Sequence, residues 1–212
     1  MVRFQNSGGI ERFCYHARMR TRESGMPEES LWESFFTPDR TLRALGLSGS
    51  CGAVVEFGCG YGTFTIPAAG LTTGAVYALD IDPAMLAATH MRASGEGLHN
   101  VQTIERDFVA EGTGLSSESC DYAMLFNILH AKDPAILLRE AYRVLAPGGI
   151  LGVMHWRYDS STPRGPSMEI RPKPEQCRDW AIEVGFELVP PGIIDLPPYH
   201  YGITFRKIKE SD

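Results

Sequence analysis

One short stretch limits the folds that are open to this chain of 212 residues. Residues 54–62 read VVEFGCGYG, an apolar strand that runs into three glycines, each separated from the next by one residue. Glycine adopts a positive φ readily and lets the backbone approach a ligand without a Cβ in the way. The helical pattern that follows offers unpaired N–H groups at its start. The stretch therefore predicts a ligand site at a strand-to-helix turn.

The spacing of these glycines distinguishes between two kinds of nucleoside cofactor. A dinucleotide fingerprint is G-x-G-x-x-G, so after Gly58 and Gly60 its third glycine would fall where this chain has Thr63. The third glycine is Gly62, one place earlier. An oxidoreductase that uses a nicotinamide dinucleotide is therefore disfavoured. A turn whose glycines serve steric purposes alone stays open for this segment in isolation.

Acidic residues follow the next two predicted strands. Strand 76–80 ends in Asp80, where a carboxylate of a doubly wound sheet can accept hydrogen bonds from both ribose hydroxyls. Asp82 precedes a proline, which is typical of a helix start, so we interpret Asp82 as an N-cap. Asp107 and Phe108 follow the strand predicted at 101–105. These side chains are expected at the edge of the sheet where the glycine turn lies.

Motifs between residues 52 and 156 resemble those of the class I S-adenosylmethionine-dependent methyltransferases. An acidic residue followed by G-x-G-x-G resembles motif I of that family, and residues 127–130, NILH, resemble its motif IV. Residues 138–149, LREAYRVLAPGG, resemble its helix-and-turn signature before the fifth strand. The resemblance implies S-adenosylmethionine as the cofactor. The cofactor-binding residues that it implies are Glu56, Gly58, Gly60, Gly62, Asp80, Ile81, Asp107, Phe108 and Asn127.

The resemblance also assigns roles to some of these residues. Glu56 is implied to help position the ammonium group of the cofactor, directly or through water, and Asp80 to bind the ribose. Asp107 is implied to accept from the adenine amino group, with Phe108 against the ring.

Strands and helices alternate along the chain, which predicts an α/β fold with a doubly wound, mostly parallel sheet. The resemblance implies a Rossmann-like sheet of seven strands whose last strand is antiparallel. Pro67 is expected to kink the helix after the glycine turn near Thr63, and Pro197 to Tyr199 are interpreted as a turn. The strands are expected at 54–57, 76–80, 101–105, 121–126, 150–156, 186–189 and 201–207. Helix starts are expected at Thr37-Pro38, Asp133-Pro134 and Pro174, the last helix ending at Gly185.

Two flanking segments are expected to determine the substrate. Residues 1–47 form a helical cap with helices at 28–36 and 38–45, ahead of a cofactor-binding domain at 48–212. In the family such a segment commonly covers the cofactor and the substrate entrance. Packing onto the sheet through Leu31, Trp32, Phe35 and Phe36 is an equally open interpretation. The proline-rich connection at 157–174 is expected to frame a pocket, or else to be a plain linker.

Composition excludes several classes of partner. The formal net charge of −6 argues against a general nucleic-acid surface, because such a surface needs a basic stripe. Arg12 to Arg22 is locally basic, and a solvated helix is favoured there over an RNA-contacting arm. No apolar run has the length of a membrane helix and no signal peptide is visible, so a cytoplasmic location is expected.

The five cysteines lack the paired spacing of a zinc site, so we interpret them as reduced thiols and expect no metal. Arsenite as acceptor would need several cysteines at one exposed site, whereas Cys59 lies in the glycine turn and Cys120 opens a buried strand.

The chemistry implied by the resemblance asks little of side chains. Methyl transfer is an in-line displacement that alignment in a dry site accelerates. His130 and His155 are candidate general bases, although each could be a structural histidine. Enzymes that methylate the exocyclic amine of adenine, or the amide of glutamine, have an Asn/Asp-Pro-Pro-Tyr/Phe motif after strand four. This chain lacks that motif there, which counts against these two acceptors. The expected acceptor is an O, N or S atom, on a small molecule or less obviously on a protein. A non-catalytic module that binds the cofactor is the alternative.

Overall fold

Seven strands form one sheet in the computed structural model, which describes residues 26–208. The strands are β1 (Val54–Phe57), β2 (Val76–Asp80), β3 (Val101–Glu105), β4 (Cys120–Phe126), β5 (Leu145–Trp156), β6 (Phe186–Leu196) and β7 (His200–Lys207). The helices are α1 (Glu29–Glu33), α2 (Pro38–Ala44), α3 (Thr65–Leu71), α4 (Pro83–Gly95), α5 (Phe108–Glu111), α6 (Pro134–Val144) and α7 (Pro174–Val184). Strands and helices alternate from β1 onward, as the sequence predicts.

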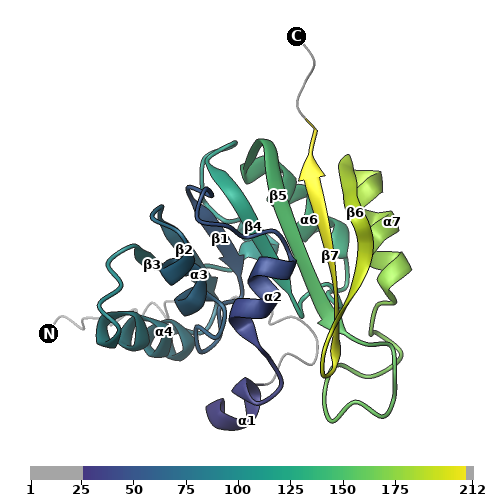
Figure 1. Ribbon diagram of the computed structural model, residues 1–212, viewed down its shortest axis with the longest axis horizontal. Coiled ribbons are helices and arrows are strands. Elements are labelled where there is room, and N and C mark those ends of the chain that lie inside the picture. The colour runs from purple at the N-terminus through teal and green to yellow at the C-terminus, as the bar shows by residue number, and fades with distance from the viewer. Residues whose placement is uncertain (1–25, 209–212) are drawn as a thin grey trace, which may run out of the picture.

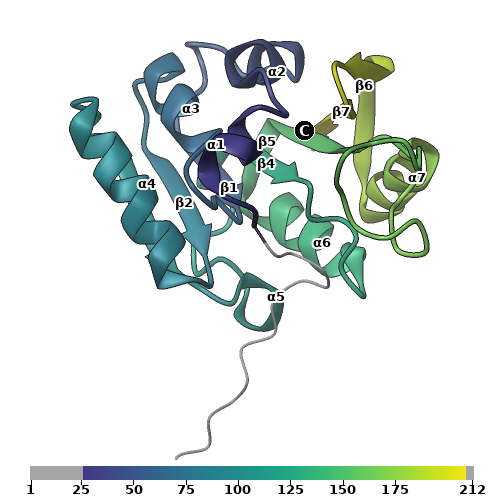
Figure 2. The ribbon, with the colours of Figure 1, turned by 90° about the horizontal axis from the view of Figure 1, so that it is seen from below.

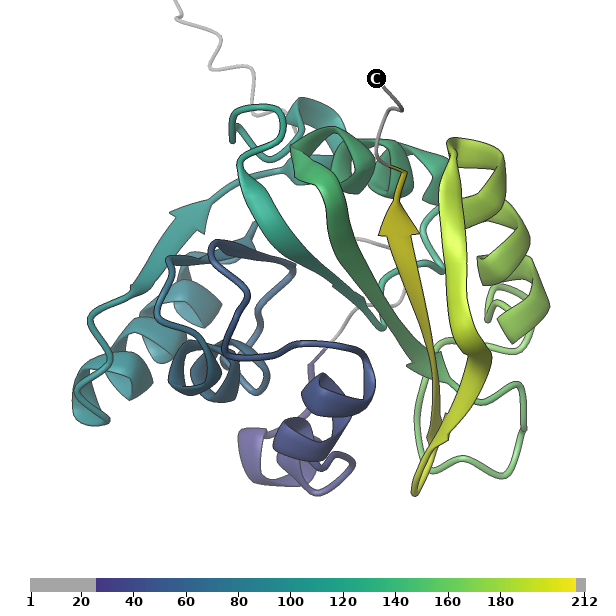
Figure 3. The ribbon, with the colours of Figure 1, turned by 45° about the horizontal axis from the view of Figure 1, so that its top comes forward.

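The sheet has the order β3-β2-β1-β4-β5-β7-β6. Strands β1 to β5 pair in parallel, and β7 lies antiparallel between β5 and β6 (Figure 3). The predicted seven-stranded, doubly wound sheet with an antiparallel last strand is therefore confirmed. Because the order reverses between β1 and β4, the carboxyl ends of these two strands flank a crevice where such sheets bind ligands.

Helices cover both faces of the sheet (Figures 1 and 2). Helices α2, α3 and α4 lie on one face, and α5, α6 and α7 lie on the other. Neighbouring residues of β4 point to opposite faces, so Met124 packs into one hydrophobic cluster and Leu125 into the other. Both side chains are fully buried. This accounts for the nearly continuous apolar run of β4, which is typical of a strand covered on both sides.

Helix starts follow the predicted chemistry in most cases. The side chains of Asp82 and Asp133 accept hydrogen bonds from the backbone N–H two residues later, and α7 ends at Gly185 with φ +113°. Thr37 precedes α2, but its side chain makes no capping hydrogen bond. The predicted kink at Pro67 was wrong. Helix α3 begins only at Thr65, so Pro67 lies in its first turn, where its missing N–H has no intrahelical partner to lose.

The far edge of the sheet contains two prolines. Strand β6 is longer than the 186–189 that the sequence predicts, and its pairing with β7 shifts register between Leu188 and Ile193. Pro190 and Pro191 lie in this interval. The following residues, 197–199, form the turn between β6 and β7, as expected from the Pro-Pro-Tyr sequence.

The described part of the N-terminal segment packs into the same core as the sheet. Leu42 and Leu45 are fully buried, and the hydroxyl of Tyr122 on β4 donates to the Leu45 carbonyl oxygen at 3.0 Å. Phe35 and Phe36 contact the ring of Trp156 with centroid distances of 5.4 and 6.4 Å. Packing onto the sheet therefore holds for both phenylalanines.

Two predictions from the sequence concern residues that the structure does not describe. The basic stretch Arg12 to Arg22 and Cys14 lie outside the described residues. Within residues 26–208, none of the helices is long and apolar enough to cross a membrane.

Candidate cofactor and acceptor pocket

A pocket of about 320 Å³ lies at the carboxyl ends of the central strands, and residues of the N-terminal segment and of the 157–173 connection contribute to its lining. The volume is at the lower end of what small-molecule sites have, about 300–1,000 Å³. Its walls come from elements far apart in the sequence. The lining residues are Met26, Trp32, Gly58, Gly60, Tyr61, Asp80, Ile81, Asp82, Met85, Phe108, Phe126, Asn127, Ile128, His130, Trp156, Arg164, Gly165 and Pro166.

The three glycines of the turn have different surroundings. All three have positive φ, at +80° for Gly58, +53° for Gly60 and +78° for Gly62. Gly58 and Gly60 line the pocket, whereas a Cβ on Gly62 would meet the hydroxyl of Thr89 at 3.0 Å. Gly62 therefore allows α4 to pack closely against the turn. A Cβ on Gly58 or Gly60 would instead meet side chains that line the pocket, Ile128 at 3.4 Å and Met26 at 3.0 Å respectively.

Asp80 connects the second strand to the glycine turn. Its carboxylate accepts hydrogen bonds from the backbone N–H of Gly60 and of Asp82, each at 3.0 Å. Burial raises the pKa of Asp80, and hydrogen bonds from the backbone oppose that shift. The side chain lines the pocket beside Ile81 and Asp82. A ligand that bonds to this carboxylate is thus held by the same group that fixes the turn.

Glu56 is buried and does not line the pocket. Its carboxyl accepts a hydrogen bond from the hydroxyl of Thr65. Burial, more than the nearby Asp80 charge, raises its pKa to about 8, although the Thr65 bond opposes the shift. The group is therefore mostly a neutral carboxylic acid at pH 7. A cation bound near it would favour its ionised form.

Asp107 and Phe108 are adjacent in the sequence, but only Phe108 lines the pocket. The Asp107 carboxylate caps α5 by accepting from the Ala110 N–H at 3.0 Å, and it does not line the pocket. Phe108 does line it, with its ring edge-on to Phe57 at a centroid distance of 5.5 Å.

Asn127 has the features of a ligand-binding residue. It follows β4 with φ +54°, a backbone conformation that residues other than glycine adopt only rarely. Its side-chain oxygen and nitrogen are both buried, and neither has a hydrogen-bond partner within the described part of the chain. Because buried amides are normally paired, these atoms point to a group supplied by a ligand.

The two candidate histidines form a pair. Nδ1 of His130 lies 3.3 Å from Nε2 of His155. His130 lines the pocket, whereas His155 is fully buried behind it. Burial lowers the pKa of His155 well below its usual range, and the neighbouring His130 and His200 lower it further. His130 can therefore touch a substrate, and His155 can act only through His130.

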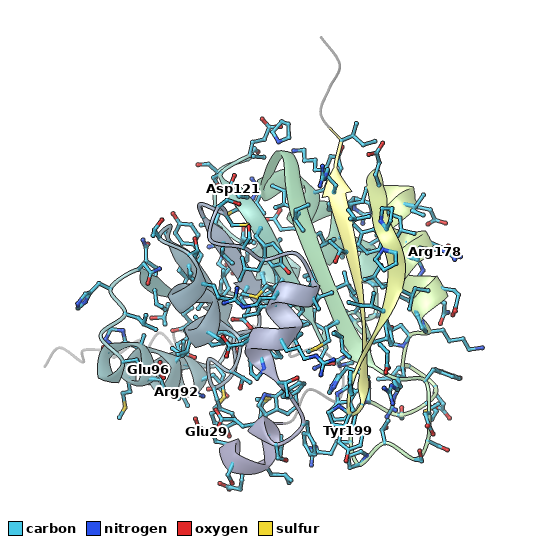
Figure 4. The ribbon with its side chains drawn as sticks, in the orientation of Figure 1. Glu29, Arg92, Glu96, Asp121, Arg178 and Tyr199 are labelled. Atoms are coloured by element: carbon cyan, nitrogen blue, oxygen red, sulfur yellow. The ribbon has the colours of Figure 1, made fainter. Side chains whose placement is uncertain are left out.

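The wall opposite the glycine turn is aromatic. Trp32 of α1 and Trp156 at the end of β5 both line the pocket. Helix α1 is held in place by Arg92 of α4, whose guanidinium contacts Glu29 at 3.2 Å and Glu33 at 2.6 Å (Figure 4). Trp32 therefore covers the pocket while Phe35 and Phe36 pack onto the sheet. Packing onto the core therefore holds for Trp32, Phe35 and Phe36 but not for Leu31, which is exposed. Cover of a bound cofactor by this segment stays a prediction.

Sequence reasoning missed part of the lining. Met85 and Ile128 are ordinary apolar residues, and no pattern sets them apart from core residues. Asp82 was interpreted as an N-cap, which it is, yet it also lines the pocket. Its position after Asp80 was the available signal. The prolines around residue 165 predicted a pocket frame, and Arg164, Gly165 and Pro166 provide it.

The described residues contain no group of three histidine, cysteine or acidic side chains that could hold a metal ion. Cys51, Cys59, Cys120 and Cys177 are free thiols, and all but Cys51 are buried. The exposed convergent thiols that an arsenite acceptor would need are not found among these four.

Residues 54–149 match a family model described as a methyltransferase domain. That range contains the glycine turn, Asp80, Asn127 and His130. These residues form a methyltransferase domain, similar to those of the class I S-adenosylmethionine-dependent methyltransferases that the sequence motifs resemble. The match bears out the predicted resemblance, and with it S-adenosylmethionine as the cofactor.

Individual relatives agree with this assignment. The methyltransferase chain is 38% identical over 109 residues to the ribosomal protein L11 methyltransferase of Methylococcus capsulatus, a match that covers 51% of this chain and 34% of the relative. It is 34% identical over 95 residues to the demethylmenaquinone methyltransferase of Geobacillus stearothermophilus, covering 43% of this chain and 40% of that one. The chain therefore spans about two fifths or less of the length of these curated relatives.

A solved structure shows the same fold. The methyltransferase chain superposes on an S-adenosylmethionine-dependent methyltransferase from Aquifex aeolicus with a TM-score of 0.74 and 21% identity, covering 85% of this chain and 94% of that one. The fold is thus shared over 85% of this chain.

Proposed function

We propose that this methyltransferase transfers a methyl group from S-adenosylmethionine to an oxygen, nitrogen or sulfur atom of a small molecule. The observation that carries the proposal is the convergence of Gly58, Gly60, Asp80, Phe108 and Asn127 on one pocket at the carboxyl ends of the strands. Glycines there leave the backbone open to a ligand, and the Asn127 amide lacks a partner that a ligand can supply. These residues fit the cofactor that the family uses.

In this proposal the carboxylate of Asp80 holds the ribose hydroxyls, and Ile81 and Phe108 contact the adenine. Gly62 supports the turn through its packing on Thr89. Glu56 acts on the ammonium group indirectly, because its carboxyl lies behind the lining. The contact of Asp107 with the adenine amino group stays a prediction, since its carboxylate caps α5.

The cofactor, when bound, supplies an electrophilic methyl group on a sulfonium. The chain aligns the acceptor and excludes water around it, with Trp32 and Trp156 as the apolar walls. His130 is placed to take a proton from an acceptor that carries one. His155 orients the His130 ring through the contact at 3.3 Å and stays neutral because it is buried.

The shape of the pocket supports a small acceptor. The same pocket of about 320 Å³ has to admit the cofactor as well as the acceptor, so the space beside the Trp32 and Trp156 rings suits a compact molecule. The two curated relatives are named for different acceptors, one a ribosomal protein and one demethylmenaquinone. The aromatic side chains in the pocket wall favour a small organic acceptor over a ribosomal protein. A cytoplasmic location stays a prediction from the sequence.

Calorimetry tests the proposal. S-adenosylmethionine and S-adenosylhomocysteine are each titrated into the purified chain, with a nicotinamide dinucleotide as the control. We expect micromolar binding of the two sulfur compounds and none of the dinucleotide. Dinucleotide binding would instead support the oxidoreductase rival. Binding of the sulfur compounds without turnover on a broad acceptor panel would favour a non-catalytic module.

A further inference from the structure

A buried arginine lies directly behind the aromatic end of the pocket. Arg171 is 7% exposed and donates six hydrogen bonds, all to uncharged oxygens. Five go to the backbone carbonyls of Arg157, Asp159, Arg164 and Pro166, and one goes to the Thr162 hydroxyl at 2.7 Å. These bonds bind the 157–173 connection into one unit.

Arg171 lacks the partner that buried charges usually have. No carboxylate of the described residues lies within ion-pair distance of it. Asp159 is the acidic group that favours its charge, but the Asp159 side chain is exposed and accepts from the Ser161 N–H. Arg157, which directly follows β5, already forms an ion pair with Asp195 of β6. The positive charge beneath the pocket wall is therefore held by uncharged oxygens, without a salt-bridge partner among the described residues.

The wall between this charge and the pocket is thin. Gly165 lines the pocket with φ +117°, and a Cβ on it would lie 2.6 Å from an Arg171 nitrogen and 2.9 Å from the Trp156 ring. The guanidinium thus packs immediately behind the glycine backbone. Arg164 and His130 line the same pocket. All three basic side chains are at the end formed by β4, β5 and the 157–173 connection.

The opposite end of the pocket is acidic. Asp80 and Asp82 line it at the end of β2. Strand β2 is three places from β5 in the sheet, so the two ends are about 14 Å apart at the usual spacing of about 4.8 Å per strand. The pocket is therefore polarised, with negative charge where the cationic cofactor is expected and positive charge where the acceptor must lie.

We infer that the methyl acceptor is an organic anion, a carboxylate or phosphate with an apolar or aromatic body. This inference rests on the proposed function, because it assigns the acidic end of the pocket to S-adenosylmethionine. The anionic group lies against the Arg164 to Pro166 wall, above Arg171. The apolar body lies between Trp32 and Trp156. A cationic amine in the same place is repelled by the buried guanidinium.

Three probes of one shape and different charge test the inference. The full chain is first saturated with S-adenosylhomocysteine, then titrated with 3-phenylpropionate, 3-phenylpropanamide and 3-phenylpropylamine. We expect the anion to bind at least about tenfold more tightly than the amine, with the amide between them. The difference should shrink as salt is raised, because the mouth of the pocket reaches solvent.

Variants locate the effect. Arg164→Gln removes a charge from the wall and should reduce the preference for the anion several-fold. Arg178→Gln removes a charge from the outer side of α7, far from α1 (Figure 4), and should leave the preference unchanged. Arg171→Met should abolish the preference. If that variant unfolds, Arg164→Gln with its control still decides.

The outcomes separate the two levels of the proposal. Failure of S-adenosylhomocysteine to bind in the first titration would overturn the proposed function. Normal binding of it, followed by equal or tighter binding of the amine, or by no binding of the anion, would overturn only the anionic acceptor. An anion preference that Arg164→Gln and Arg178→Gln reduce equally would also overturn it.

Discussion

Gly60 and Gly62 are two residues apart, yet a side chain at each would meet different surroundings. Gly60 faces the pocket, and Gly62 faces Thr89. We predict that Gly60→Val abolishes S-adenosylhomocysteine binding, because the side chain would occupy the ligand space. Gly62→Ala should cost about 1–3 kcal/mol of stability through its strained φ, while the folded fraction still binds. Calorimetry and urea unfolding measure both effects. Normal binding by Gly60→Val would refute the assignment of the turn.

Asp80 should contribute to affinity in two ways. Its carboxylate is expected to bond to the ribose, and it also fixes the Gly60 N–H at 3.0 Å. Asp80→Ala should weaken cofactor binding by about 1.5–3 kcal/mol, the range for hydrogen bonds to a charged group. Calorimetric titration of S-adenosylhomocysteine gives the change directly. An affinity within about threefold of the wild type would contradict the ribose contact, while Asp133→Ala, a cap outside the pocket, serves as the control.

Glu56 should make the stability of the cofactor-free protein depend on pH. Burial raises its pKa from 4.5 to about 8, so the folded state holds the proton more tightly than the unfolded state. This contribution is present below about pH 4.5 and is lost as the pH rises towards 8. Wild type should therefore lose stability relative to Glu56→Gln between pH 5 and 8, as measured by urea unfolding.

The comparison between the two proteins isolates Glu56 from other titrating groups. Burial lowers the pKa of His155 and lowers that of His200 to about 3, and these shifts act in the opposite direction, adding stability as the pH rises towards 6.5. Both histidines are present in wild type and variant, so their effects cancel. Parallel pH curves for the two proteins would contradict the buried neutral carboxyl.

At the scale of elements, the 157–173 connection depends on one side chain. Arg171→Met would leave the carbonyls of this segment without their donor, which should cost about 1–3 kcal/mol and open the segment to protease. Arg171→Lys keeps the charge but not the planar fork, so it should give an intermediate result. Limited proteolysis with cleavage-site mapping measures the effect. Unchanged resistance of residues 157–173 in Arg171→Met would contradict this role.

The elements show where sequence reasoning succeeds and where it stops. Strands β1 to β4 could be predicted nearly to the residue, because apolar runs bounded by glycine and acidic residues define them. The bounds of β6 could not, since Pro190 and Pro191 conceal a strand that continues past them. Arg171 was not foreseen as part of the site wall. Its hydrogen bonds exist only once the connection has closed on itself.

The same limit applies to the site residues. Gly58, Gly60, Asp80, Ile81, Phe108 and Asn127 could be placed at the pocket because each lies at or just after a strand end, and His130 likewise. The sequence does not say that Glu56 turns its carboxyl towards Thr65, or that His155 lies behind His130. Orientation of a side chain around a strand end depends on the packing of the neighbouring helices.

At the scale of the whole molecule, the N-terminal helices belong to the core. Phe35, Phe36, Leu42, Leu45 and Leu47 are all buried, and burying such side chains contributes about 1.5–3 kcal/mol each. Their sum is comparable to the full stability of a domain, about 5–15 kcal/mol. We predict that a fragment of residues 48–212 fails to unfold cooperatively, as measured by circular dichroism during heating. The predicted boundary at residue 47 would then separate the cap from the cofactor-binding domain by their proposed roles, but the two parts would fold as one unit.

A matched pair of substitutions tests this without deleting a segment. Leu45→Ala should cost about 2–5 kcal/mol, because the side chain is fully buried. Leu31→Ala, on the exposed side of α1, should change stability by less than about 0.5 kcal/mol. Equal effects of the two substitutions would contradict a shared core.

The prolines of β6 have a consequence for how copies of this molecule meet one another. Strand β6 is the outermost strand of the sheet, and outer strands offer unpaired N–H groups on which a strand of another chain can align. Pro190 and Pro191 remove two successive N–H groups from β6, and because N–H groups alternate in direction along a strand, one of the two is lost from the outer edge; the register shift beside them also breaks the regular spacing of that edge. A foreign strand therefore finds no continuous ladder there. The sheet ends at β6, which protects concentrated protein against edge-to-edge aggregation along this side.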